Sequence, residues 1–150
     1  MDGTSPASFS KGGHGNRWLE VYGNNNYTGA TTVKAGYLRI TNDSPHTFLN
    51  NTTFTGPGHL QIRPNNTNFG SVLSMSDINF TGTSIGKFYI GRSGTTTKFV
   101  LDEDIDVNGE EIHFYMPVEL NGGDRDIKAT NNHVRSVSYT HLTLPTTVIV

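Results

Sequence analysis

The chain has 150 residues, of which 33% are hydrophobic and 16% are charged, with a net charge of −2 and no cysteine. Thr (20 residues), Gly (17) and Asn (15) together make up about a third of the chain, and helix-forming residues are sparse. This composition excludes a helix bundle, a coiled coil, a disulfide framework and the basic surface of a nucleic-acid-binding protein. Strand-forming Thr, combined with turn-forming Asn and Gly, predicts an all-β chain with many turns.

Short alternating segments follow the first residues of the chain. Residues 1–8 are expected to be an unstructured leader, and residues 1–16 lack the apolar stretch of a secretory signal. Beyond them, apolar and polar residues alternate at 18–21, 31–33 and 38–40, with Gly or Asn between the segments. Such alternation is typical of half-buried strands, so the sequence predicts short strands joined by tight turns.

A three-residue motif, aromatic–Thr–Gly, recurs along the chain. It occurs as Tyr27-Thr28-Gly29, Phe54-Thr55-Gly56 and Phe80-Thr81-Gly82, with a weaker copy at Val107-Asn108-Gly109. The motif glycines are therefore spaced almost equally along the sequence. The first three copies are each followed by a second glycine and then by two alternating apolar residues: Gly36, Leu38 and Ile40; Gly58, Leu60 and Ile62; Gly86, Phe88 and Ile90.

The period of this motif indicates a solenoid rather than a propeller, because one propeller blade needs roughly 40–45 residues. We therefore predict a parallel β-solenoid of about four to five coils of 26–27 residues over residues 9–136. A β-sandwich built from the same short strands is the alternative. The solenoid predicts two stacked columns: one of Tyr27, Phe54, Phe80 and Val107, and one of Leu38, Leu60, Phe88 and Ile112.

Residues 11–40 resemble the autotransporter-associated β-strand repeat of bacterial surface proteins. The resemblance rests on Lys11-Gly12-Gly13, on WLEVYG at 18–23 and on NYTGATTVKAGYLRI at 26–40. Ala30 stands where that repeat usually has Gly, and residues 118–127 are similar to the spacer between such repeats. The resemblance implies a right-handed parallel β-helix with a structural role, and it supplies no catalytic residues.

The end of the chain resembles translated cloning sequence. Residues 137–146 (VSYTHLTLPT) are similar to the reading-frame translation of a transposase adapter that is used in preparing sequencing libraries. We therefore expect residues 137–150 to be a non-native tail outside the fold. On this interpretation the natural C-terminal part is missing from the sequence.

Two acidic segments are candidate sites. Asp104, Asp106 and Asn108 have the spacing of the first half of a calcium-binding loop, but Tyr115 stands where that loop needs a glutamate. A tight turn at Asn108-Gly109 is the favoured interpretation, so no metal is expected. Asp124 and Asp126 could form the acid–base pair of a glycoside-cleaving enzyme, but a solvated turn is favoured there as well.

The aromatic residues of the predicted strands form a third candidate site. Tyr37 and Tyr89 flank Leu38 and Ile90, so they are expected to point outward when the apolar residues point inward. Outward aromatic rings can stack on sugars, although ordinary packing on the strand face is the alternative. The histidines are scattered and lack the spacing of metal ligands.

The sequence thus predicts a structural passenger segment of an autotransporter-like protein, without catalysis or a cofactor, located extracellularly or on the bacterial outer surface. Its expected partners are neighbouring coils of the same full-length chain. Membrane contact would come only through a missing C-terminal part. An adhesin module that binds surface glycans is the alternative function, and a polysaccharide-active β-helix enzyme is a third.

Overall fold

The computed structural model describes residues 9–14, 16–26, 28–80, 85–107, 111–129 and 133–136. Positions 27, 81, 82, 108 and 109 of the repeated motif, and the predicted leader and tail at 1–8 and 137–150, fall outside these residues. The chain forms a β-solenoid of about five turns, and about 45% of the described residues are in strands and about 8% in helices. All of its strand pairs are parallel among the described residues. The predicted solenoid is therefore confirmed, and the β-sandwich is excluded.

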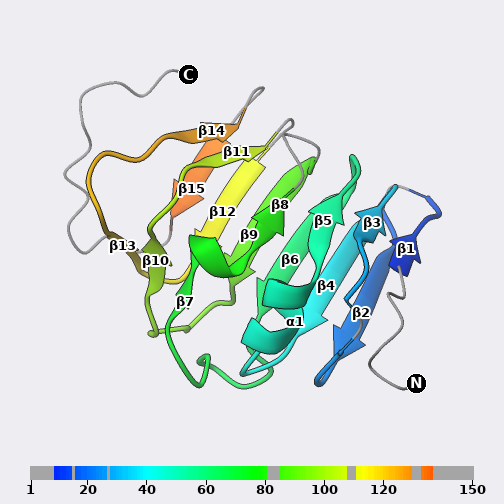
Figure 1. Cartoon of the computed structure of the whole chain (residues 1–150), viewed down its shortest axis with the longest axis horizontal. Coiled ribbons are helices and arrows are strands. Elements are labelled where there is room, and N and C mark those ends of the chain that lie inside the picture. Colours follow the sequence, from blue (N-terminus) through cyan, green and yellow to red (C-terminus); the bar gives the residue numbers. More distant parts are fainter. Residues whose placement is uncertain are drawn as a thin grey trace.

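One six-stranded sheet, which we call the long sheet, runs the length of the solenoid (Figure 1). Its strands follow one another in chain order, one from each coil: β2 (Trp18–Tyr22), β4 (Tyr37–Thr41), β6 (His59–Arg63), β9 (Lys87–Gly91), β12 (Glu111–Tyr115) and β15 (His133–Ser136). Each strand pairs in register with the next, so one position of the coil forms a continuous row across the sheet.

The other faces of the solenoid are made of shorter sheets. One contains β1 (Phe9–Lys11), β3 (Thr31–Val33), β5 (Thr53–Thr55) and β8 (Asn79–Phe80). Another contains β7 (Leu73–Ser74), β10 (Phe99–Leu101) and β13 (Val118–Leu120), and a third contains β11 (Ile105–Val107) and β14 (Ile127–Ala129). Two short helical segments interrupt these faces, α1 (His46–Asn51) and the 3-10 turn η1 (Met75–Asp77).

The coils differ in length. Successive partners in the first row of the long sheet are Trp18, Tyr37, His59, Lys87, Glu111 and His133. The coil from Trp18 to Tyr37 is the shortest of these, and the coil from His59 to Lys87 is the longest. The uniform repeat that the glycine spacing predicted is therefore not present. The longest coil contains the loop at 64–72 between β6 and β7.

The core lies on the inner face of the long sheet. Leu38, Leu60, Phe88 and Ile112 are in register and at most 1% exposed, so this predicted column is confirmed. A parallel column beside it consists of Ile40, Ile62, Ile90 and Phe114. Burying each such side chain contributes about 1.5–3 kcal/mol. A narrow core of this kind explains how a chain with few apolar residues folds.

The second predicted column is wrong in part. Phe54 does pair with Phe80, but the partner of Phe54 in the preceding coil is Thr31, which lies beyond Tyr27 in the sequence. Val107 is fully buried in β11 and pairs with Ala129. The predicted column assumed that residues at equal distances from the motif glycines lie side by side. In the structure, the pairing of the strands decides which residues are neighbours, and that pairing does not keep equal distances from the glycines.

The described residues of the first copy, Thr28 and Gly29, lie outside the strands. Thr28 is exposed, and the backbone oxygen of Gly29 accepts a hydrogen bond from Thr52 Oγ1 at 2.8 Å. The strand of this coil, β3, begins only at Thr31. The resemblance between the first and second copies is therefore one of composition and not of position in the coil.

The second glycines of the motif do occupy equivalent corners, each one residue before a strand of the long sheet. The Gly58 amide donates to Val33 O at 2.7 Å, and the Gly86 amide donates to Gly58 O at 3.0 Å. A Cβ at Gly58 would lie only 2.6 Å from Val33 O. Backbone therefore approaches backbone at this corner, and glycine is needed for space.

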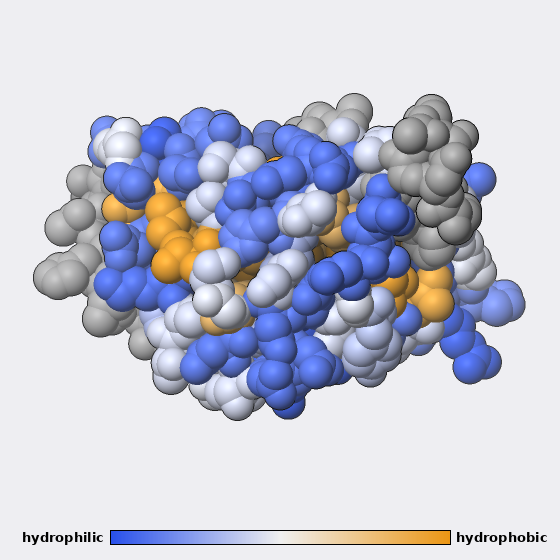
Figure 2. Space-filling view, turned by 60° about the horizontal axis from the view of Figure 1, so that its bottom comes forward, coloured by the Kyte–Doolittle hydropathy of each residue, from blue (hydrophilic) through white to orange (hydrophobic). Residues whose placement is uncertain are grey.

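The terminal coils bury their core residues less completely than the middle ones. Leu19 and Val21 at one end, and Leu120, Ile127 and Ala129 at the other, are only partly buried against the core. In Figure 2 the visible side is mainly hydrophilic, and its larger apolar areas lie toward the left and right of the view. The apolar column is thus closed in the middle coils and less covered at both ends.

No helix within the described ranges has the length and apolar character needed to cross a membrane.

Candidate functional site

The outer face of the long sheet brings together the polar and aromatic residues of its six strands. Because side chains alternate along a strand, the first, third and fifth residues of each strand point away from the core. The third row, for example, consists of Glu20, Arg39, Gln61, Tyr89, His113 and Arg135. These residues are far apart in sequence, and only the register of the coils makes them neighbours. We call this surface the outer face.

Aromatic rings on the outer face stack along the solenoid axis. The ring of Tyr37 lies 4.1 Å from that of Trp18 on one neighbouring strand and 4.3 Å from that of His59 on the other. Further along the sheet, the His113 and Tyr115 rings, which lie two residues apart on β12, are stacked on each other at 3.8 Å. The contacts of Tyr37 link successive coils in addition to the backbone hydrogen bonds.

Tyr37 and Tyr89 lie on the outer face, beside the buried Leu38 and Ile90, as their alternation predicted. Their surroundings differ from those of an open sugar platform. Trp18 and His59 flank the Tyr37 ring on both sides, so Tyr37 packs within a ladder of rings.

Tyr89 is held by a hydrogen bond to the next strand. Its hydroxyl donates to Glu111 Oε2 at 2.9 Å. Burial first, and then this carboxylate, raises the pKa of Tyr89. The hydroxyl therefore stays protonated and available as the donor of this hydrogen bond.

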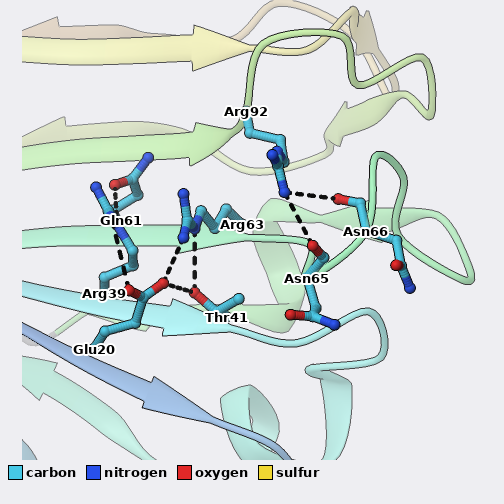
Figure 3. A network of polar contacts seen from close by, with 8 residues as sticks. All are labelled: Glu20, Arg39, Thr41, Gln61, Arg63, Asn65, Asn66 and Arg92. Carbon is cyan, nitrogen blue, oxygen red and sulfur yellow. Dashed lines mark hydrogen bonds and ion pairs between the residues drawn. The ribbon is translucent and has the colours of Figure 1, made fainter.

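The carboxylate of Glu20 is the centre of a polar network (Figure 3). Its Oε1 accepts hydrogen bonds from Thr41 Oγ1 at 2.5 Å and from Arg63 Nη2 at 2.6 Å, and its Oε2 lies 3.8 Å from Arg39 Nη1. Burial raises the pKa of Glu20, but hydrogen bonds from Thr41, Arg63 and Tyr22, together with the positive charge of Arg63, outweigh it, and the pKa lies below its ordinary value. The network therefore holds Glu20 ionised and joins three successive coils.

Arg39 connects this network to the aromatic ladder. Its Nε donates to Gln61 Oε1 at 2.8 Å, and its guanidinium lies 4.0 Å from the centre of the Trp18 ring. Burial and the neighbouring Arg63 lower the pKa of Arg39. The side chains cover one another so well that Gln61 is 7% exposed and Thr41 only 2%, although both point away from the core. The outer face is thus a second, polar packing layer.

A separate set of contacts fixes the loop at 64–72. Arg92 Nη1 donates to Asn65 O at 2.9 Å and to Asn66 O at 3.3 Å (Figure 3). Asp43 accepts from the backbone and the side chain of Asn66. Asn68 Oδ1 accepts from the backbone amides of positions 96 and 97. Contacts from the coils before and after thus support the longest insertion of the solenoid.

The acidic segment at 102–106 makes contacts between coils. Asp102 accepts from the Ser76 amide at 3.0 Å and from Ser76 Oγ at 2.6 Å, and Asp104 Oδ1 accepts from the Asp126 amide at 3.0 Å. Asp106 is exposed on β11. The described residues contain no group of three or more His, Cys, Asp or Glu side chains that could hold a metal ion. Asn108, the third residue of the calcium candidate, lies outside the described residues.

Asp124 and Asp126 have different surroundings. Asp126 forms an ion pair with Lys128 at 3.0 Å, and Asp124 is exposed. Arg125, which lies between them, donates to the backbone oxygen of Asn121 at 2.9 Å. These contacts tie the segment between β13 and β14 to its own backbone and to Lys128.

Sequence reasoning found the outward tyrosines but missed the network of Glu20, Arg39 and Arg63. A signal for it exists, since each of these residues lies one or three positions from the inward column residue of its strand. To use that signal, one must know the length of each coil. The coils are unequal in length, and the almost equal spacing of the glycines does not reveal this.

Comparison with known proteins found no match to this chain among protein-family models, curated proteins or solved structures.

Proposed function

We propose that the chain is a structural segment of a surface-displayed bacterial protein, with the passenger of an autotransporter-like protein as its context. The observation that carries this proposal is the uninterrupted stacking of the coils. Six strands of the long sheet stay in register, and both the apolar column inside and the polar and aromatic rows outside continue from coil to coil. The resemblance of residues 11–40 to the autotransporter-associated repeat supports the location.

The mechanism of such a segment is mechanical. Each coil adds one strand spacing, about 4.8 Å, along the axis and passes its row of hydrogen bonds to the next coil. Side chains of the outer face also hold the coils together. The ion pair between Arg63 and Glu20 spans 43 positions in sequence and joins coils that are not adjacent. A stack of this kind projects whatever follows it away from the cell.

Display on a bacterial surface tests this function. The chain is placed between an N-terminal epitope and an outer-membrane barrel anchor, and antibody binding to intact cells is measured. We expect the epitope to be displayed and removed by external protease. A Leu60→Asp variant, whose core column is disrupted, should lose the display. Absence of display for the unchanged chain, with the anchor alone displaying normally, would contradict the proposal.

A second function, adhesion to surface glycans, is supported by the aromatic residues at the edge of the outer face. Trp18 is 46% exposed and Tyr22 is 61% exposed, whereas Tyr37 is enclosed between two rings. Exposed aromatic rings beside hydrogen-bonding side chains suit sugar recognition. A glycan array with the purified chain, compared with a Trp18→Ala and Tyr22→Ala variant, tests this function. Binding that is equal for both proteins would contradict it.

A further inference from the structure

The outer face carries an excess of positive charge in a chain whose net charge is negative. The strands of the long sheet contain four Lys or Arg residues and two Glu residues, whereas the whole chain has a net charge of −2. Three neighbouring strands carry only positive charge. β4, β6 and β9 contribute Arg39, Arg63 and Lys87, and they contain no acidic residue. Acidic side chains are therefore concentrated on the other faces.

Two of these cations share a single carboxylate. Arg63 contacts Glu20 through Nη2 and Thr41 through Nε, and Arg39 contacts Glu20 through Nη1 and Gln61 through Nε. Within the described part of the chain, Arg63 Nη1 and Arg39 Nη2 have no hydrogen-bonding partner. The side chains of Arg39 and Arg63 are each 22% exposed. Arg63 also lowers the pKa of Arg39, as expected for two cations that one anion does not fully neutralise.

We propose that the outer face over β4, β6 and β9 binds an extended acidic polysaccharide, with sugar carboxylates on the unoccupied guanidinium nitrogens of Arg39 and Arg63. This inference rests on the second proposed function, adhesion to glycans, and names the class of glycan. The carboxylate is favoured because a guanidinium presents N–H donors in a planar fork that matches it. Trp18, stacked against Arg39, offers an exposed apolar surface beside this pair for the sugar ring.

The direction of the polysaccharide follows from the register. Arg39 and Arg63 lie on adjacent strands but in different rows, because Arg39 pairs with Gln61 and Arg63 pairs with Thr41. They are offset by one strand spacing, about 4.8 Å, along the solenoid axis and by two residues, about 6.6 Å, along the strand. A polysaccharide that contacts both side chains therefore crosses the strands diagonally. Glu20 and Glu111 lie on strands on either side of the basic strands, which limits the positive region to a few sugar units.

The experiment measures binding of the whole chain to polygalacturonate, to neutral dextran and to single-stranded DNA by affinity electrophoresis or calorimetry. Arg39→Gln and Arg63→Gln should each weaken polygalacturonate binding about tenfold. Lys98→Gln is the matched control, because Lys98 is exposed near β10 and loses the same charge. Circular dichroism and thermal melting establish that each variant is folded under the binding conditions.

Glu20→Gln separates recognition from a loss of structure. This change removes the competing carboxylate and keeps an amide for Thr41 and Arg63, so polygalacturonate binding should become about threefold tighter. A damaged fold would not produce tighter binding. For polygalacturonate, the two arginine variants should thus bind more weakly, the Glu20 variant should bind more tightly, and the Lys98 variant should bind as the unchanged chain does.

Three results would overturn the inference. Dextran binding that equals polygalacturonate binding would show that the acidic group is not recognised, while glycan adhesion itself would stand. DNA binding at the same affinity would reveal a general polyanion effect. No binding to either glycan would remove the inference, while the glycan array would still decide the adhesive function and the display experiment the structural one.

Discussion

The long sheet and the remaining faces of the solenoid are built from the same coils, yet they differ in regularity. Strands of the long sheet pair over up to five residues, and the sheet continues through all six of its strands without interruption. The other faces consist of separate sheets with strands of two or three residues, and α1, η1 and the loop at 64–72 lie among them. All of the variation in coil length therefore falls outside the long sheet.

The difference shows which part of a coil defines the fold. On the long sheet each strand lies against its neighbours in register, so an inserted residue would move all later side chains to the opposite face. On the other faces an insertion only lengthens a turn, which is inexpensive in free energy. The contacts of Arg92 and Asp43 with the 64–72 loop show how one such insertion is held.

The largest effect is expected for the inner column of the long sheet. Phe88 is fully buried and in register with Leu60 and Ile112, so Phe88→Ala should lower the free energy of unfolding by about 3–5 kcal/mol. Val72, which is 57% exposed in the long loop, provides the control, and Val72→Ala should change it by less than about 0.5 kcal/mol. Urea unfolding measures both. Similar losses for the two variants would mean that the column is not the core.

A smaller effect is expected at the corner that leads into the long sheet. Gly58→Ala would place a methyl group 2.6 Å from Val33 O, and the resulting shift of backbone should cost about 1–3 kcal/mol. At Gly12 an added Cβ meets nothing within 4 Å, so Gly12→Ala serves as the control. Thermal unfolding compares the two variants. An equal melting temperature for both would contradict the close approach of the backbones.

The smallest effect concerns the polar layer of the outer face and depends on pH. Because the pKa of Glu20 is lowered in the folded state, its contribution to stability is complete above the ordinary pKa of 4.5. It is lost as the pH falls through the lower pKa of the folded protein. Glu20→Gln should therefore destabilise the protein by about 1 kcal/mol at pH 7, and the difference should shrink in acid. A difference that stays constant from pH 7 to pH 3 would exclude the ionised network.

Prediction from the sequence succeeded where alternation alone decides the structure. Leu38, Leu60, Phe88 and Ile112 were placed in one column because each belongs to an alternating segment after a motif, and the second glycines mark equivalent corners. The same alternation placed Tyr37 and Tyr89 on the outside.

Prediction failed where the alignment of coils relied on composition. The Tyr27-Thr28-Gly29 motif looks like Phe54-Thr55-Gly56, but Thr31-Thr32-Val33 occupies the equivalent strand. Gly and Thr are abundant throughout this chain, so the motif cannot distinguish a turn from a strand. The network of Glu20, Arg39 and Arg63 could not be found for the same reason, since its members meet only when the unequal offsets between successive strands are known.

Disulfide trapping tests the register of the coils most directly, because the chain contains no cysteine of its own. Thr32 and Thr55 pair across β3 and β5, and their hydroxyl oxygens lie 3.1 Å apart. Adjacent strands have the Cα separation that a disulfide requires. A protein with Thr32→Cys and Thr55→Cys should therefore form the bond on mild oxidation, and a protein with Thr28→Cys and Thr55→Cys should not. Efficient bonding of the second pair, with none in the first, would show that the coils follow the glycine motif and would contradict the register described above.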